Sequence, residues 1–309
     1  MSDCTIGIDI GGTNLRLALI TGGGQIVARR RLPSLIAEGR DAFCDRLLFG
    51  IEELRFEALS HSVNIAGIGV GIPGLVDSEG FIRASVNMRP LDGFNLAAFI
   101  TGKTGLMAES GNDANAIAVG EQLFGAGRGL SSFMVITIGT GLGSGLILDG
   151  RLWKGAEGFA AEFGHVTVNP EGDLCPCGNR GCLERYVSAD ALLRSITTTF
   201  PTEADRYCSL KAEEIASMAR SGDSSAQYAF DTMGKWFGIA LASLTNLLNP
   251  EAFIIGGGVG ASLDLFETAL RNEIAKRCFS EMFSNLKILK GELGDDAGLY
   301  GAAALMFRR

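Results

Sequence analysis

Two glycine-rich segments carry residue types that could hold phosphate groups. Asp9 comes just before the turn Gly11-Gly12-Thr13, and Gly139-Thr140-Gly141 opens a run with further glycines at 143 and 145. Without a Cβ, glycine lets backbone N–H groups approach a phosphate, and a carboxylate suits Mg²⁺, which prefers oxygen ligands. We therefore predict two phosphate turns, with ordinary hairpin turns as the alternative. A third segment, Gly256-Gly257-Gly258, could let a flat base or a ribose lie against the backbone.

The sharpest local signal is a set of three cysteines and one histidine. His165 is followed by Cys175, Cys177 and Cys182, with two glycines between the last two cysteines. Three thiolates and one imidazole complete the tetrahedral set that zinc favours, and four protein ligands are typical of a structural site. Three reduced cysteines in a loop are the alternative. The other histidine, His61, lies in a polar stretch and is expected to be solvated.

Side chains that suit sugar hydroxyls lie in two places. Glu162 and Glu184 bracket the cysteine loop, so a metal that fixed the loop would also fix these acceptors. The imidazole of His165 has a second nitrogen that can donate to the same ligand. Asn112 and Asp113 stand where a loop becomes a helix. Asp113 is either a helix N-cap or a general base that accepts a hydroxyl proton.

Two familiar nucleotide motifs fail on inspection. Gly102-Lys103-Thr104 has the form of the end of a P-loop, but Ala97 occupies the position of the first glycine of that motif. The segment from Gly69 to Gly74 has the spacing G-x-G-x-x-G after a strand, but no convincing helix follows Pro73. A dinucleotide oxidoreductase is therefore only a minor alternative.

The elements that must position these residues form a mixture of strands and helices. Apolar patterning predicts a meander of three antiparallel strands over 5–31, an amphipathic helix over 38–59 and a buried parallel strand over 65–72. Further expected elements are a helix over 114–124, strands over 133–138, 145–148 and 252–255, a mostly helical region over 188–248, and helices over 263–278 and 298–307. These alternations predict an α/β protein.

The composition limits the class of protein. Of 309 residues 43 are glycine and only 7 proline, hydrophobic residues reach 47%, and the net charge is −8. Such a chain can bury large cores, and it lacks the clustered basic residues that grip nucleic acid. We see no signal peptide, and the longest uncharged stretch is too polar for a membrane span. Seven cysteines, an odd number, argue against a disulfide framework. We expect a cytoplasmic protein without nucleic-acid or membrane partners.

Taken in order, these motifs resemble those of sugar kinases of the ROK family, which have a two-lobed actin-like ATPase (ribonuclease H-like) fold with mixed sheets. The resemblance spans nearly the whole chain and is most specific where Glu-x-x-His at 162–165 is joined to C-x-C-G-x-x-G-C-x-E at 175–184. It implies a lobe of residues 1–111 completed by a C-terminal helix in 295–309. A second lobe, residues 112–294, would hold the sugar, zinc and adenosine sites. ATP and sugar would lie in a cleft between the lobes.

The resemblance also implies a role for each matched residue. Asp113 is expected to deprotonate the sugar hydroxyl. The expected sugar-binding residues are Gly74, Asn87, Asn112, Asp113, Glu162, His165 and Glu184. The expected ATP-binding residues are Asp9, Gly11, Gly12, Thr13, Gly139, Thr140, Gly141, Gly256, Gly257 and Gly258. Structural Zn²⁺ is expected on His165, Cys175, Cys177 and Cys182, and Mg²⁺ on the phosphates of ATP.

The predicted function is ATP-dependent phosphorylation of a hexose, with glucose at O6 as the first candidate, by a homodimeric enzyme. Kinases for N-acetylmannosamine, fructose or another hexose are alternatives, because they share most of these residues. A sugar-responsive repressor of the same family is the alternative from another class. Such repressors carry a helix-turn-helix before the Asp-x-Gly-Gly segment, and here a first strand near Thr5 is expected to leave no room for one.

Overall fold

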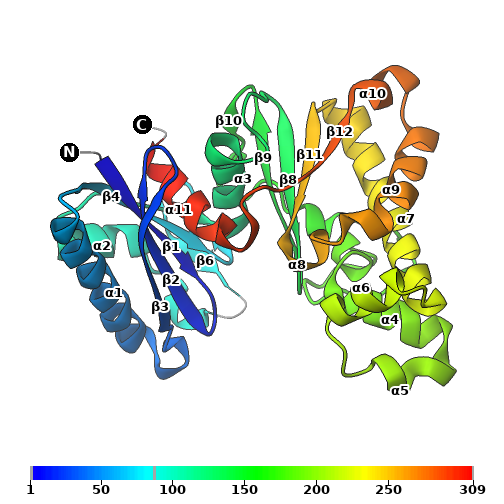
Figure 1. The fold of residues 1–309 in the computed structure, drawn as a ribbon, viewed down its shortest axis with the longest axis horizontal. Helices are drawn as coiled ribbons and strands as arrows, with labels where there is room; N and C mark the ends of the chain where they lie inside the picture. Colours follow the sequence, from blue (N-terminus) through cyan, green and yellow to red (C-terminus); the bar gives the residue numbers. More distant parts are fainter. Residues whose placement is uncertain (1–2, 86–87, 308–309) are drawn as a thin grey trace. The chain divides into compact units, whose positions relative to one another are not determined.

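The chain forms two compact units in a computed structural model that describes residues 3–85 and 88–307 (Figure 1). Unit 1 comprises residues 1–130, 145–161 and 292–309, and unit 2 comprises residues 131–144 and 162–291. These units differ from the expected lobes, because unit 1 also includes residues 112–130. The lobe boundaries at 111/112 and 294/295 therefore stay a prediction.

A five-stranded sheet with the order β3-β2-β1-β4-β7 lies at the centre of unit 1. The antiparallel meander of β1, β2 and β3 is confirmed, and so is a parallel strand β4 beside β1. The strands are β1 (Asp3–Ile10), β2 (Asn14–Thr21), β3 (Ile26–Pro33), β4 (Asn64–Ile72) and β7 (Ala108–Asn112). The sequence patterns missed β7, because its residues are small or polar instead of β-branched.

The two faces of this sheet are covered differently, because side chains alternate along each strand. On one face, Ile6 and Ile8 belong to a buried cluster that includes residues of α1 (Arg40–Ser60) and α2 (Leu96–Thr104). On the other face, Gly69 lies against α11 (Ala297–Phe307), where an added Cβ would be 1.8 Å from the carbonyl oxygen of Ala302. Figure 1 shows α1 and α11 on opposite sides of the sheet. Gly69 is thus a packing residue, in agreement with the rejection of the dinucleotide motif.

The remaining elements of unit 1 carry candidate site residues. Helix α3 (Asp113–Phe124) packs against α11. Gly74 is followed by the hairpin of β5 (Leu75–Val76) and β6 (Ile82–Ala84), so no helix opens there. Gly102, Lys103 and Thr104 form the last turn of α2, which excludes a P-loop. Asn87, an expected sugar-binding residue, lies outside the described residues.

Unit 2 contains the helices between 189 and 285 and most of a second five-stranded sheet, which has the order β10-β9-β8-β11-β12. Its strands are β8 (Phe133–Ile138), β11 (Ala252–Gly256), β12 (Lys287–Lys290) and the start of β9 (Leu142–Leu148), whose end lies in unit 1 and pairs with β10 (Arg151–Leu152). Its helices are α4 (Ala189–Thr199), α5 (Ala204–Tyr207), α6 (Ala212–Arg220), α7 (Ser224–Leu248), α8 (Gly257–Gly260), α9 (Leu263–Arg277) and α10 (Ser280–Asn285). The expected helical region is confirmed.

Helices α7 and α9 lie side by side and supply much of the core of unit 2 (Figure 1). The rings of Phe230 and Phe266 stack with centroids 6.5 Å apart, and both side chains are buried. Within the described ranges, neither these nor any other helix has both the length and the hydropathy of a membrane span.

Candidate active site

In the turn between β1 and β2, the carbonyl groups of Gly12 and Thr13 accept hydrogen bonds from Ser34, and the amide of Gly11 donates to the carbonyl oxygen of Asn14 at 2.9 Å. The hydroxyl of Ser34 donates to the carbonyl oxygen of Gly12 at 2.7 Å, and the amide of Ser34 donates to that of Thr13 at 2.9 Å. Gly12 and Thr13 are exposed, and in the described part of the chain no hydrogen bond from either amide is seen. Exposed N–H groups on a glycine turn are what a bound phosphate requires.

Asp9, at the end of β1, is held by an arginine that sequence reasoning missed. Arg16 donates through Nε to Oδ2 of Asp9 at 2.9 Å and through Nη1 to the carbonyl oxygen of Asp295 at 2.7 Å. Asp9 and Arg16 are directly opposite in the β1–β2 pair. Cross-strand partners of opposite charge are favourable, so the register of the expected meander was the signal that could have found Arg16.

The N-terminus of α3 brings Asn112 and Asp113 next to Gly74. Asn112 is the cap: its Oδ1 accepts the amide of Asn115 at 3.0 Å, and its Nδ2 donates to the carbonyl oxygen of Gly74 at 3.1 Å. Asp113 is the first helical residue, and its Oδ1 accepts the amide of Ala114 at 2.8 Å. The alternative that Asp113 is the N-cap is therefore wrong. Its partly exposed carboxylate lies at the helix end where the dipole favours negative charge.

The second glycine turn is shorter than expected. The amide of Gly139 donates to the carbonyl oxygen of Gly141 at 2.9 Å, so the turn closes over 139–141, while Gly143 and Gly145 already belong to β9. A Cβ on Gly145 would lie 2.6 Å from the Cβ of Ala118. Gly143 and Gly145 therefore belong to the strand and not to the turn, and Gly145 is required by packing on α3.

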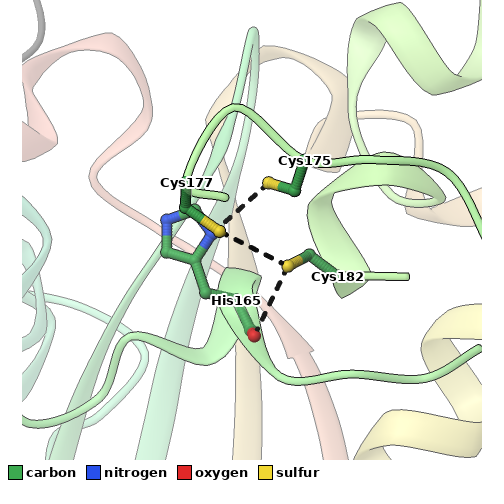
Figure 2. Close-up of side chains that lie close together, drawn as sticks. All are labelled: His165, Cys175, Cys177 and Cys182. Atoms are coloured by element: carbon green, nitrogen blue, oxygen red, sulfur yellow. Dashed lines mark hydrogen bonds between the residues drawn. The ribbon is translucent and has the colours of Figure 1, made fainter. Parts of the chain in front are cut away.

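The expected metal ligands converge in unit 2 (Figure 2). One ligand atom from each of His165, Cys175, Cys177 and Cys182 lies within 4.8 Å of all the others. Sγ of Cys177 is 3.6 Å from Sγ of Cys182, and Sγ of Cys175 is 3.8 Å from Nδ1 of His165. Zinc–sulfur bonds of about 2.3 Å in a tetrahedron separate two sulfurs by roughly 3.8 Å. Both the donor set and its spacing fit zinc.

Two short helical turns join these ligands to the candidate sugar carboxylates. His165 ends a turn over 163–165 that follows Glu162, and Cys182 precedes a turn over 183–185 that contains Glu184. The amide of Leu183 donates to the carbonyl oxygen of Val166 at 2.9 Å, which ties the two segments together. Both carboxylates therefore lie on the segments that carry the expected metal ligands.

Glu162 and Glu184 are close enough to influence each other electrostatically. Burial raises the pKa of Glu162, nearby His165 opposes the rise, and the negative charge of Glu184 adds to it. A carboxylate accepts hydrogen bonds through two oxygens. Two of them beside one imidazole can hold several hydroxyl groups of a polyol.

The third glycine segment lies where β11 runs into α8. Gly257 has φ 82°, and a Cβ on it would lie 2.4 Å from the carbonyl oxygen of Ile138, so this glycine is required by the junction with β8. Gly258 is exposed, and an added Cβ there would meet no atom within 4 Å. The segment thus offers open backbone surface at Gly258.

Tyr186 supports the cysteine loop and was not found from the sequence. Its hydroxyl accepts Nδ2 of Asn169 at 3.1 Å, and its ring lies 4.5 Å from that of Trp236 on α7. The amides of Val168 and Asn169 both donate to the carbonyl oxygen of Gly181, next to Cys182, an expected metal ligand. A single aromatic residue after a cysteine motif belongs to no recognisable spacing, so the sequence alone could not indicate its role.

Known proteins are similar to this chain over nearly its whole length. A family model described as "ROK family" matches residues 5–309. A glucokinase from Halalkalibacterium halodurans is 32% identical over 97% of this chain and 94% of its own length. A xylose repressor from Caldicellulosiruptor bescii is 34% identical over 97% of this chain and 77% of its own. A solved ROK-family glucokinase from Streptomyces griseus, in complex with glucose and AMPPNP, is 33% identical, covers 98% of both chains and superposes with a TM-score of 0.81.

Proposed function

Because the chain belongs to the ROK family and has its two-lobed actin-like fold, we propose that it is an ATP-dependent sugar kinase whose substrate is a hexose, with glucose phosphorylated at O6. The observation that carries the proposal is the cluster of Glu162, Glu184 and His165, which stands beside the glycine turn over 139–141 in unit 2. Hydroxyl acceptors next to a turn suited to phosphate are what a kinase for a polyol needs.

Asp113 is the proposed general base. It accepts the proton of the attacking hydroxyl, and its position at the first residue of α3 is fixed by the cap that Asn112 forms. The sugar hydroxyls are proposed to contact Glu162, His165, Glu184 and Asn112, with Asn87 and the backbone at Gly74 nearby. The side-chain amide of Asn112 donates to the carbonyl oxygen of Gly74, so a shift of one residue would move the other.

The nucleotide is proposed to lie on the three glycine segments. The turns Gly11-Gly12-Thr13 and Gly139-Thr140-Gly141 hold the phosphates through the amides of residues 12, 13, 140 and 141, because the amides of Gly11 and Gly139 already donate to carbonyl oxygens of Asn14 and Gly141. Gly256, Gly257 and Gly258 face the adenosine. Asp9 is proposed to orient a hydrated Mg²⁺ through Oδ1, since Arg16 occupies Oδ2. Phosphoryl transfer needs little covalent chemistry from the protein, so positioning and charge neutralisation are its main contributions.

The cysteine cluster is proposed to bind structural Zn²⁺. His165, Cys175, Cys177 and Cys182 fill a tetrahedral set, so no position remains for a catalytic water. Bound zinc supplies rigidity to the loop. Glu162 and Glu184 then stay in place as hydroxyl acceptors.

The substrate is the part of the proposal most open to test. Initial rates of ADP formation with Mg-ATP should be measured for glucose, mannose, fructose, allose, N-acetylglucosamine and N-acetylmannosamine. We expect the highest kcat/KM with glucose. A different preferred hexose would correct the substrate and keep the kinase. Sugar binding without any ADP formation would instead support a sugar-sensing regulator, as the similarity to a xylose repressor allows.

A further inference from the structure

Leu142 is a common anchor for both carboxylate segments. It follows the turn over 139–141 and is the first residue of β9. Its amide donates to Oε2 of Glu184 at 2.8 Å. Its carbonyl oxygen faces Gly164, two residues after Glu162, where an added Cβ would approach to 2.7 Å. The end of the nucleotide-side turn is therefore in contact with both segments that carry the sugar-side carboxylates.

The glycines of this turn have different surroundings. A Cβ on Gly141 would lie 2.5 Å from Oε2 of Glu184 and 3.4 Å from its carboxyl carbon. A Cβ on Gly139 would meet no atom within 4 Å, and neither residue has a positive φ. Gly141 therefore lacks a side chain because Glu184 lies against it, whereas nothing in the described structure demands a glycine at 139.

A second bond fixes the turn to the same segment. The carbonyl oxygen of Gly139 accepts the amide of Ala189, the first residue of α4, at 2.9 Å. Glu184 and Ala189 thus hold the two ends of the turn from one stretch of chain six residues long. A displacement of this stretch moves the turn, and a displacement of the turn moves Glu184.

We propose that the turn over 139–142 sets the position of the carboxylate of Glu184, and that Gly141 is a positioning residue for the sugar although it stands in a turn assigned to phosphate. The identity of the ligand rests on the proposed function. Because binding coupling is reciprocal, a nucleotide that orders this turn favours sugar binding by the same factor by which the sugar favours the nucleotide.

The test compares Gly141→Ala with Gly102→Ala, which adds the same methyl group at the end of α2, where it would meet no atom within 4 Å. The dissociation constant for D-glucose is measured by calorimetry without nucleotide, so that the phosphate role of the turn is not involved. We expect Gly141→Ala to raise this constant at least ~10-fold, as loss of one hydrogen bond to a charged group would. Gly102→Ala should stay within about 2-fold of wild type. Equal constants for the two variants would overturn the inference.

Amide hydrogen exchange of the ligand-free protein tests the contact without any sugar. Peptides over 139–146 and 182–189 should both exchange faster in Gly141→Ala and match wild type in Gly102→Ala. Unchanged exchange in Gly141→Ala contradicts the inference.

If wild type fails to bind glucose, the proposed substrate is wrong, and exchange alone decides whether Glu184 is positioned by the turn. If Gly141→Ala does not fold, Gly164→Ala replaces it. On the segment that carries Glu162, its added Cβ would lie too close to the carbonyl oxygen of Leu142 and should accelerate exchange over 139–146.

Discussion

At the residue scale, polar side chains in the site serve two purposes at once. Asn112 caps α3 and also holds the carbonyl oxygen of Gly74. Glu184 is a proposed sugar ligand and already accepts the amide of Leu142. Such residues are predictable from the sequence as candidates, because their types and spacing are distinctive. Their protein partners are not predictable in the same way, because those partners are backbone groups far away in the sequence.

Replacement of Asp113 by asparagine tests the proposed base. Asparagine cannot accept the hydroxyl proton, so kcat should fall at least ~10²-fold while glucose still binds measurably. Asp190 lies in the first turn of α4 as Asp113 does in α3, so Asp190→Asn controls for the loss of an acidic residue near a helix N-terminus. Steady-state kinetics would contradict the assignment if the two variants lost the same small fraction of kcat.

Glu251 offers a prediction about pH and stability. Amides of Ser132 and Ser131 donate to its carboxylate and lower its pKa below the usual range. A lowered pKa in the folded state means that stability is present above the unfolded-state pKa of about 4.3 and is lost as pH falls through the folded value. Glu251→Gln should lower the thermal midpoint at pH 7, with the difference from wild type shrinking towards pH 3. A difference that stays constant with pH would contradict this account.

At the element scale, long periodic segments were predicted well and short ones were not. Helices α1, α3 and α9 and strands β1 to β4 appear where apolar spacing placed them. Strands β7 and β12 were missed, since each is at most five residues long and mixes polar with apolar positions. The sequence predicts ligand contact for the glycines of three turns. Gly69 and Gly145 show a second reason for glycine, because each allows a helix to pack directly on a strand.

Loss of metal from the cysteine loop should weaken sugar binding. Cys177→Ser removes one ligand of four, so bound zinc should fall below the expected one ion per chain and the KM for glucose should rise. Glu162 and Glu184 lose their fixed positions at the same time. Cys208 is exposed and lies outside the cluster, so Cys208→Ser is the matched control. A full zinc content by elemental analysis and an unchanged KM for glucose in Cys177→Ser would contradict the predicted link between zinc and sugar binding.

At the scale of the whole molecule, the order of the motifs identified the family, and the described structure and the relatives agree with it. The same fold occurs in relatives named as kinases and as repressors, so the fold does not decide the activity. The proposed roles of Asp113 as a base and of the amides of Gly12 and Thr13 as phosphate ligands are the basis on which we propose a kinase and not a repressor. The identity of the hexose and a homodimeric assembly stay predictions, because both depend on contacts with molecules other than this chain.

The most direct test of the kinase assignment is product identification by ³¹P NMR with glucose, Mg-ATP and the purified protein. We predict that glucose 6-phosphate and ADP form in a one-to-one ratio. A reaction that yields ADP and inorganic phosphate without a sugar phosphate, or no ADP while glucose is bound, would contradict the assignment.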